Sequence, residues 1–268
     1  ASATFLVTTL TMSSESFLAW GWRVPFVASV VLVGVGLYVR LKLTETAVFT
    51  SIDHVKTRLP IVEAITSRPR AVLLGALSTT TAFAFFYIGV TYLTTYGTTE
   101  LKLTRPTVLG LGIAGGAAMM ITTIISANLA DRIGRRRVVT LGSVAAVVAG
   151  IIVFPIIDIA AAWAFGVGLC LVMGVVGLAY GAQGSLLPEL FPTRYRYTGA
   201  GIAYNLAGVL GGGVVPLVAA SVVPTYGSLA LGIILTVVAV IGLACTLALP
   251  NTNAGSFAEQ DALAAASR

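Results

Sequence analysis

Long apolar runs separated by short polar breaks dominate the pattern along the chain. A helix needs about 20 mostly apolar residues to cross a bilayer. Seven runs approach or reach this length, at 24–39, 71–96, 107–129, 138–157, 161–187, 198–223 and 228–249. Residues 1–12 add an apolar stretch of about half a span. The pattern predicts an all-α fold, a polytopic membrane helix bundle.

The composition supports this interpretation. Of the 268 residues, 57% are hydrophobic and 10% are charged, whereas soluble domains carry about 25% charged residues. So few charges leave too little polar surface for a water-soluble body. The net charge of +6 does not indicate nucleic-acid binding, because the positive residues lie in short loops between the apolar runs. We expect the partner of this surface to be a lipid bilayer, with no nucleic acid.

Lysine and arginine are distributed unevenly between the two sides of the expected membrane. The loops at 40–70, 131–137 and 188–197 hold most of them, and the chain ends in Arg268. The opposite loops hold only Arg23, Lys102 and Arg105. The positive-inside rule therefore places the three basic loops and the C-terminus in the cytoplasm.

The longest basic loop, 40–70, contains one apolar stretch of its own. Pro60 is suited to the first position of a helix, and Ile61, Val62 and Ile65 follow it on one face. We expect a short amphipathic helix on the membrane surface. His54 is the only histidine in the chain, and without neighbouring ligands it indicates no metal site.

The densest charge lies in the loop ANLADRIGRRR at 127–137. Gly134 permits a tight bend, the arginines fix topology, and Asp131 can accept hydrogen bonds from an arginine or from a helix N-terminus. A charge cluster that pairs in one conformation and separates in another acts as a latch. The candidate latch comprises Asp131, Arg132, Gly134, Arg135 and Arg136, with Glu189, Arg194 and Arg196 of the next basic loop as partners.

Four stretches resemble one family of transporters. The loop at 127–137 resembles the signature G-x-L-A-D-R-x-G-R-R-R of the major facilitator superfamily, in its second-half copy, with Ala127 in place of the usual glycine. The sequence WGWRVPF at 20–26 resembles the start of the sixth helix of the metabolite:proton symporters, the branch with proline/betaine, shikimate, 2-oxoglutarate and citrate carriers. The end of that helix, at 40–49, and the loop ELFPTRYRYTG at 189–199 resemble the same branch, although Ala47 replaces a proline.

The resemblance implies the second half of a major-facilitator fold plus the preceding helix, with the first four helices absent. The missing N-terminal helical bundle would then be a partner of this chain. The expected parts are the end of a truncated transmembrane helix (1–12), an outer loop and transmembrane helix (13–39), a cytoplasmic inter-bundle loop (40–70), a C-terminal six-helix transmembrane bundle (71–249) and a cytoplasmic tail (250–268).

Glycine spacing suggests helix packing. Gly110, Gly112 and Gly115 match the dinucleotide-binding string GxGxxG, but they lie inside an apolar run, whereas that motif must join a strand to a helix in water. Small residues in apolar runs let helix backbones approach one another. We therefore expect packing there, and also at the pairs Gly112/Gly116, Gly177/Gly181 and Gly208/Gly212.

Midspan polar and aromatic residues are the candidates for contact with a solute. All ten acidic residues fall in loops, turns or the tail, so a proton carrier is expected in the absent half, as the resemblance also implies. Thr80 shares a predicted helix face with three of the candidates. The seven candidates are Phe83, Tyr87, Thr91, Tyr180, Gln183, Tyr204 and Asn205. Each of them could instead hydrogen-bond a neighbouring helix.

These features favour a secondary active transporter of the bacterial inner membrane. It would move a small organic acid or zwitterionic osmolyte with protons by alternating access. The alternatives are a uniporter or drug-efflux carrier of the same fold, and a non-transporting membrane fragment. We expect no enzyme, no catalytic residue, no metal and no cofactor, because the chain has no His/Cys cluster and no paired intramembrane acids.

Overall fold

The computed structural model describes residues 4, 7–8, 11–42 and 59–250. Within these residues there is no strand, and seven helices are long and apolar enough to cross a membrane. They are Gly21–Lys42, Pro69–Thr99, Arg105–Ile133, Arg135–Ile157, Ala162–Glu189, Arg196–Tyr226 and Ser228–Ala248. Each covers one of the apolar runs, so the predicted all-α membrane helix bundle is confirmed.

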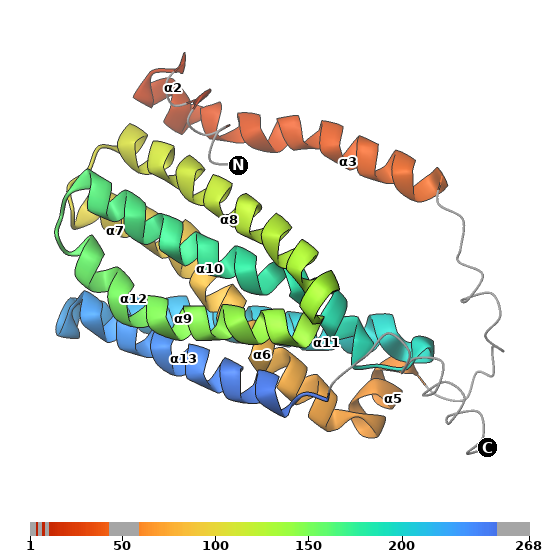
Figure 1. Ribbon diagram of the computed structural model, residues 1–268. Coiled ribbons are helices and arrows are strands. Elements are labelled where there is room, and N and C mark those ends of the chain that lie inside the picture. Colours follow the sequence, from red (N-terminus) through yellow and green to blue (C-terminus); the bar gives the residue numbers. More distant parts are fainter. Residues whose placement is uncertain (1–3, 5–6, 9–10, 43–58, 251–268) are drawn as a thin grey trace, which may run out of the picture.

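Six of these spans pack into one bundle (Figure 1). Two are interrupted by wider, π-helical turns. The first runs through α6 (Pro69–Tyr87), η2 (Ile88–Tyr92) and α7 (Leu93–Thr99). The second runs through α11 (Arg196–Ala207), η4 (Gly208–Val214) and α12 (Val215–Tyr226). The other four are α8 (Arg105–Ile133), α9 (Arg135–Ile157), α10 (Ala162–Glu189) and α13 (Ser228–Ala248).

Helix α10 packs against α8 and α9, and α13 packs against α9 and α6. Small residues bring α10 close to α8: a Cβ atom on Gly177 or Gly181 would collide with the backbone of α8. The hydroxyl of Ser126 on α8 also donates to the Leu178 carbonyl oxygen at 2.6 Å. The predicted close packing at Gly177/Gly181 is therefore confirmed.

The GxGxxG string lies wholly inside α8. A Cβ atom on Gly115 would lie 3.1 Å from Leu169 on α10, which confirms the packing interpretation for this residue. Gly110 and Gly116 instead face open space. The spacing of glycines thus marks a helix contact only where a partner helix passes that face.

Two glycines form tight turns that need a positive φ. Gly134 (φ 96°) separates α8 from α9, and Gly227 (φ 76°) separates α12 from α13. L-residues with side chains rarely adopt this backbone conformation. The bend predicted at Gly134 is confirmed.

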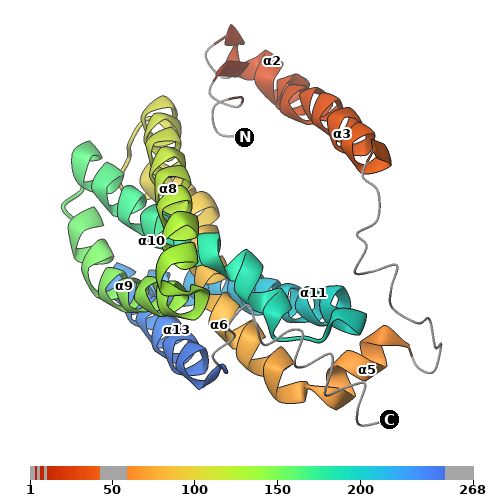
Figure 2. The ribbon, with the colours of Figure 1, turned by 45° about the vertical axis from the view of Figure 1, so that its right-hand side comes forward.

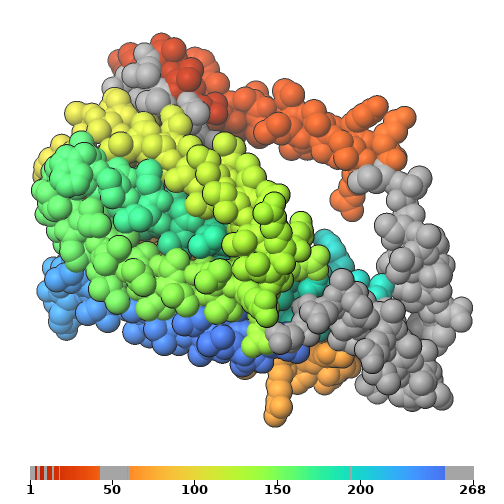
Figure 3. All heavy atoms as spheres, in the orientation of Figure 1, coloured from red at the N-terminus to blue at the C-terminus, as the bar shows by residue number. Residues whose placement is uncertain are grey.

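The segment before the bundle begins with α2 (Ser14–Ala19), the 3₁₀ turn η1 (Gly21–Arg23) and α3 (Val24–Lys42). Arg23 donates from Nη1 to the Ala19 carbonyl oxygen at 2.9 Å, and its guanidinium lies 4.6 Å from the Trp22 ring centroid. Helix α3 buries none of its residues and stands apart from the six-helix bundle in both ribbon views (Figures 1 and 2). The space-filling view shows the same separation (Figure 3).

Helix α5 (Pro60–Ser67) is the short helix expected from the sequence, and Pro60 is its first residue. Ala64 is fully buried, whereas Ile61 and Ile65 are exposed. Helix α5 contacts α11 and joins a buried cluster with residues from both sides of the α8–α9 turn and from the α10–α11 junction. We call this region of the bundle the basic end. His54, the rest of the loop at 43–58, most of residues 1–12 and the tail at 251–268 lie outside the described residues.

Candidate functional site

Five aromatic side chains line a pocket of about 280 Å³ between α6, α8, α10 and α11, which we call the aromatic pocket. The ring centroids of Phe83 and Tyr204 lie 4.9 Å apart in an edge-to-face arrangement, and Phe83 stacks on Tyr87 at 6.4 Å. The other two aromatic side chains are Phe86 from α6 and Tyr180 from α10. Tyr87, Tyr180 and Tyr204 are each 38–40% exposed, so their rings face open space beside the bundle.

A second pocket of about 400 Å³ lies on the side of Tyr180 and Tyr204 that is nearer the basic end, and we call it the polar pocket. The two tyrosines line both pockets, and their hydroxyl oxygens lie 3.1 Å apart in a hydrogen bond. Gln183 and Asn205 contribute amides to the polar pocket. The structure thus brings together six of the seven residues proposed from the sequence.

Gln183 has a defined amide orientation. Its Nε2 donates to Thr79 Oγ1 at 2.9 Å, while the Thr79 hydroxyl donates to the Gly75 carbonyl oxygen at 2.7 Å. Gln183 is only 4% exposed, and its Oε1 is buried with no hydrogen-bond donor among the described residues. Most buried polar atoms have a partner, so an exception needs an explanation.

The seventh candidate, Thr91, lies elsewhere. It belongs to η2 and lines a separate pocket of about 720 Å³ near the other end of the bundle, with Tyr92, Tyr96 and Glu100. The π-helical turn explains the displacement, because one extra residue per turn rotates the positions that follow. Thr80 lines none of these three pockets: it is 7% exposed and its hydroxyl donates to the Ala76 carbonyl oxygen of its own helix.

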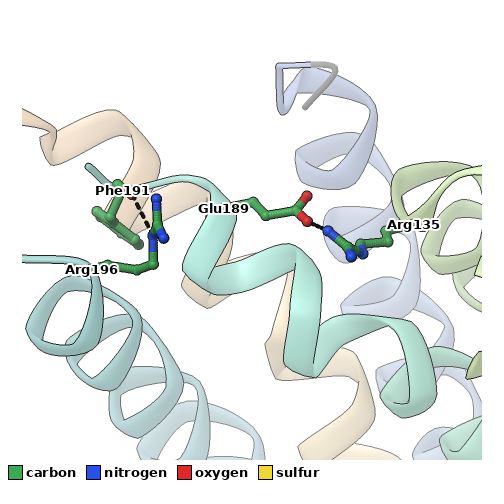
Figure 4. Close-up of polar contacts among 4 residues, drawn as sticks. All are labelled: Arg135, Glu189, Phe191 and Arg196. Carbon is green, nitrogen blue, oxygen red and sulfur yellow. Dashed lines mark hydrogen bonds and ion pairs between the residues drawn. The ribbon is translucent and has the colours of Figure 1, made fainter. Parts of the chain in front are cut away.

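At the basic end, Arg135 forms an ion pair with Glu189 (Figure 4). The Glu189 side chain is 6% exposed and that of Arg135 is 35% exposed. The sequence interpretation placed all acidic residues in loops, turns or the tail. This is wrong for Glu15, Glu63, Asp131 and Glu189, which lie in helices, and of these four only Glu189 is buried. Glu189 is the last residue of α10, because Pro188 sits in the final turn and the helix continues through it.

Two further arginines in the same region donate hydrogen bonds to backbone carbonyl oxygens at or just after the end of a helix. Arg136 donates from Nε to the Thr246 carbonyl oxygen at 3.2 Å and from Nη2 to that of Leu247, at the last turn of α13. Cations are favourable at a helix C-terminus. Arg196 donates from Nε to the Phe191 carbonyl oxygen at 3.1 Å. Arg194 lies in the 3₁₀ turn η3 (Thr193–Tyr195), and burial raises the pKa of the Tyr195 phenol beside it.

Asp131 and Arg132 differ from these arginines. Both are exposed in the last turn of α8, and neither forms an ion pair with any described residue. An acidic side chain at a helix C-terminus interacts unfavourably with the helix dipole. Asp131 therefore gains no stabilisation from the α8 dipole in this conformation.

Thr79 and Asp158 form hydrogen bonds in the bundle and were not proposed from the sequence, nor was Phe86 of the aromatic pocket. Thr79 orients Gln183, and the signal for it was the run of four hydroxyl residues at 78–81 inside an apolar span. Asp158 accepts hydrogen bonds from Tyr96 at 3.1 Å and from Ser228, which joins the ends of three helices away from the basic end. No local pattern marks Asp158, because its partners lie far away in the sequence.

The chain matches the family model described as Major Facilitator Superfamily over residues 1–216. The chain belongs to the major facilitator superfamily. Its six-helix bundle with α3 before it has the architecture of the second half of that fold plus the preceding helix, as the resemblance implied.

The curated relatives belong to the metabolite transporter branch. The chain is 34% identical over 260 residues to the inner membrane metabolite transport protein YhjE of Escherichia coli, covering 94% of this chain and 59% of that protein. It is 33% identical over 231 residues to the E. coli shikimate transporter, covering 84% and 52%. It is 30% identical over 266 residues to the E. coli proline/betaine transporter, covering 94% and 52%. The chain spans little more than half the length of these relatives.

Proposed function

We propose that this chain forms the second-half wall of a secondary active transporter that moves a small organic acid or zwitterionic osmolyte with protons across the bacterial inner membrane. The relatives supply the class of protein: they are named as transporters of metabolites, of shikimate and of proline and betaine. The observation that carries the proposal is the exposed aromatic pocket with the polar pocket beside it.

The wall has chemistry suited to a small polar solute. Ring faces of Phe83, Tyr87 and Tyr204 can cover the apolar part of the solute or a cationic group, and hydroxyls and amides can bind its polar groups. Transporters built from repeats bind solutes near the bilayer midplane where the two halves meet. We propose that a first-half bundle of the family's kind faces this wall and supplies the proton carrier.

Orientation follows from the charges. We propose that the basic end, with the loop at 40–70 and the C-terminus, lies in the cytoplasm, in line with the positive-inside rule. Trp20 and Trp22 lie at the other end of α3, where an aromatic belt is expected. The division of the chain into the parts at 1–12, 13–39, 40–70, 71–249 and 250–268 belongs to the same proposal.

We further propose that the basic end holds a conformational latch. Arg135, Arg136 and Glu189 hold the helices of this half together. Asp131 and Arg132 project from the same turn, and we assign them to contacts made in the other conformation of the transport cycle. The turn at Gly134 sets the direction in which they project, and we assign Arg194 and Arg196, from the next basic loop, to the same latch.

A flux assay tests the proposal. The purified protein is reconstituted into liposomes, and uptake of labelled shikimate, proline and glycine betaine is followed with an alkaline interior, with and without a protonophore. We expect accumulation of at least one solute above its equilibrium level, and loss of that accumulation with the protonophore.

The other outcomes identify the alternatives. Equilibration of the solute across the membrane at a rate and level independent of the proton gradient would indicate a uniporter. Accumulation of hydrophobic drugs inside proton-loaded liposomes, in exchange for protons that leave, would indicate an efflux carrier. Stable insertion with no flux of any solute would indicate a non-transporting membrane fragment and would contradict the proposal.

A further inference from the structure

Two amide side chains whose orientation is set by hydrogen bonds line the polar pocket. The Thr79 hydroxyl uses its hydrogen on the Gly75 carbonyl, so only the amide nitrogen of Gln183 can approach Thr79 as a donor. This fixes which way the Gln183 amide points and leaves Oε1 as an acceptor with no donor among the described residues. Leaving a buried acceptor unpaired is unfavourable, and such atoms commonly await a ligand or water.

Asn205 shows the same arrangement one helix away. Its Nδ2 donates to the Gly201 carbonyl oxygen at 2.8 Å, which leaves Oδ1 as an acceptor. Gln183 and Asn205 both line the polar pocket, and no lysine, arginine, aspartate or glutamate lines it. A carboxylate offers only acceptors, so these amide oxygens have nothing to give it. An ammonium or hydroxyl group offers the hydrogens that they lack.

We propose that the polar pocket is a second solute station, in which the carbonyl oxygens of Gln183 and Asn205 bind the N–H or O–H groups of the solute and not its carboxylate. This inference rests on the proposed function, since it assigns a role to the same wall. The Tyr180–Tyr204 hydroxyl pair stands between the two stations. A solute that moves from the aromatic pocket toward the basic end passes this pair and exchanges ring contacts for amide acceptors.

A series of zwitterions isolates the hydrogen-bond donor. Glycine, sarcosine, N,N-dimethylglycine and glycine betaine keep the same carboxylate and the same charges, while the ammonium loses one hydrogen at each step. Binding is measured by calorimetry on the purified protein in lipid nanodiscs, and shikimate provides a hydroxyl-bearing acid. We expect Gln183→Met, which keeps the length of the side chain and removes the acceptor, to weaken binding of sarcosine and shikimate about tenfold. Binding of glycine betaine should change by less than about twofold.

Two further variants keep the test informative if Gln183→Met folds poorly. Thr79→Val preserves the shape of the side chain but frees the amide to turn, so we expect a smaller loss with the same preference for N–H-bearing solutes. Phe83→Leu alters the aromatic pocket, so it should weaken all members of the series alike. An equal loss for betaine and sarcosine in both Gln183→Met and Thr79→Val would overturn the second station alone. Failure of the unaltered protein to bind any of these solutes would overturn the proposed function as well.

Discussion

Buried polar groups are paired at the basic end, whereas one is left unpaired at the wall, by which we mean the residues that line the aromatic and polar pockets. Helix α10 carries one example of each. Glu189, at the end of α10, is buried and paired with Arg135. Gln183, less than two turns earlier, is equally buried but keeps an unpaired carbonyl oxygen. Helix α10 therefore contributes a paired buried acid to the basic end and an unpaired buried acceptor to the wall.

This difference indicates that the polar groups of the basic end stabilise the fold, whereas those of the wall are available to bind a solute. At the basic end Arg135, Arg136 and Arg196 each connect two chain segments. Removing one partner of a buried charge pair leaves the other without compensation, which is strongly destabilising. At the wall, open pockets and an unpaired acceptor reduce stability but provide contacts for a solute. Functional sites commonly carry such a cost.

The largest effect is expected where pairing is most complete. Arg135→Ala should lower the free energy of unfolding by about 3 kcal/mol, because it takes the cation away from the buried Glu189 carboxylate. Equilibrium unfolding in detergent micelles measures this loss. Arg137→Ala is the matched control, since Arg137 lies two residues away in the same helix and is exposed. Exposed charges contribute little, so this variant should stay within about 0.5 kcal/mol of the unaltered protein. Equal losses in the two variants would show that net charge, and not the ion pair, stabilises the basic end.

A smaller effect, on transport and not on stability, is expected at the exposed acid of the same end. Asp131→Asn removes the charge that the proposed latch needs in the other conformation, so solute uptake into liposomes should fall about tenfold, the value of one charge-assisted hydrogen bond. Stability should be unchanged or slightly raised, because a negative charge leaves the C-terminal turn of α8. Unchanged uptake would remove Asp131 from the mechanism. A parallel loss of stability would place it with Arg135.

The sequence was sufficient for the spans and for the residues that form the wall. Apolar runs long enough to cross a bilayer predicted all seven helices, because only a helix satisfies its backbone in lipid within a single segment of about 20 residues. Helical spacing brought together Phe83 and Tyr87 on one helix, and Tyr180 and Gln183 on another. A bend at Gly134 was expected because a tight turn joins two long helices there.

The errors came from local departures from a regular α-helix and from contacts between distant segments. Thr91 was grouped with Tyr87 by α-helical spacing, but the π-helical turn at Ile88–Tyr92 rotates it into another pocket. Glu189 was assigned to the loop at 188–197, whereas α10 continues through Pro188 and ends at Glu189. Thr79 and Gln183 are 104 residues apart, so their hydrogen bond could not be inferred from either segment alone.

The smallest effect is expected at the second π-helical turn, where two adjacent glycines face different surroundings. A Cβ atom on Gly212 would lie 2.7 Å from the Tyr87 ring, whereas one on Gly213 would meet nothing within 4 Å. Tyr87 is 39% exposed, so Gly212→Ala should displace its ring at modest cost rather than unfold the bundle. We expect this variant to weaken solute binding about two- to threefold by calorimetry, because the displaced ring loses part of its aromatic contact with Phe83.

Gly213→Ala is the matched variant for this prediction. It makes the same chemical change in the same turn but touches neither pocket, so binding should be unchanged. If both alanine variants weaken binding equally, the property that matters is the flexibility of the π-helical turn and not the position of Tyr87. If Gly212→Ala destabilises the protein as much as Arg135→Ala does, the wall is packed as tightly as the basic end, and the contrast between the two regions fails.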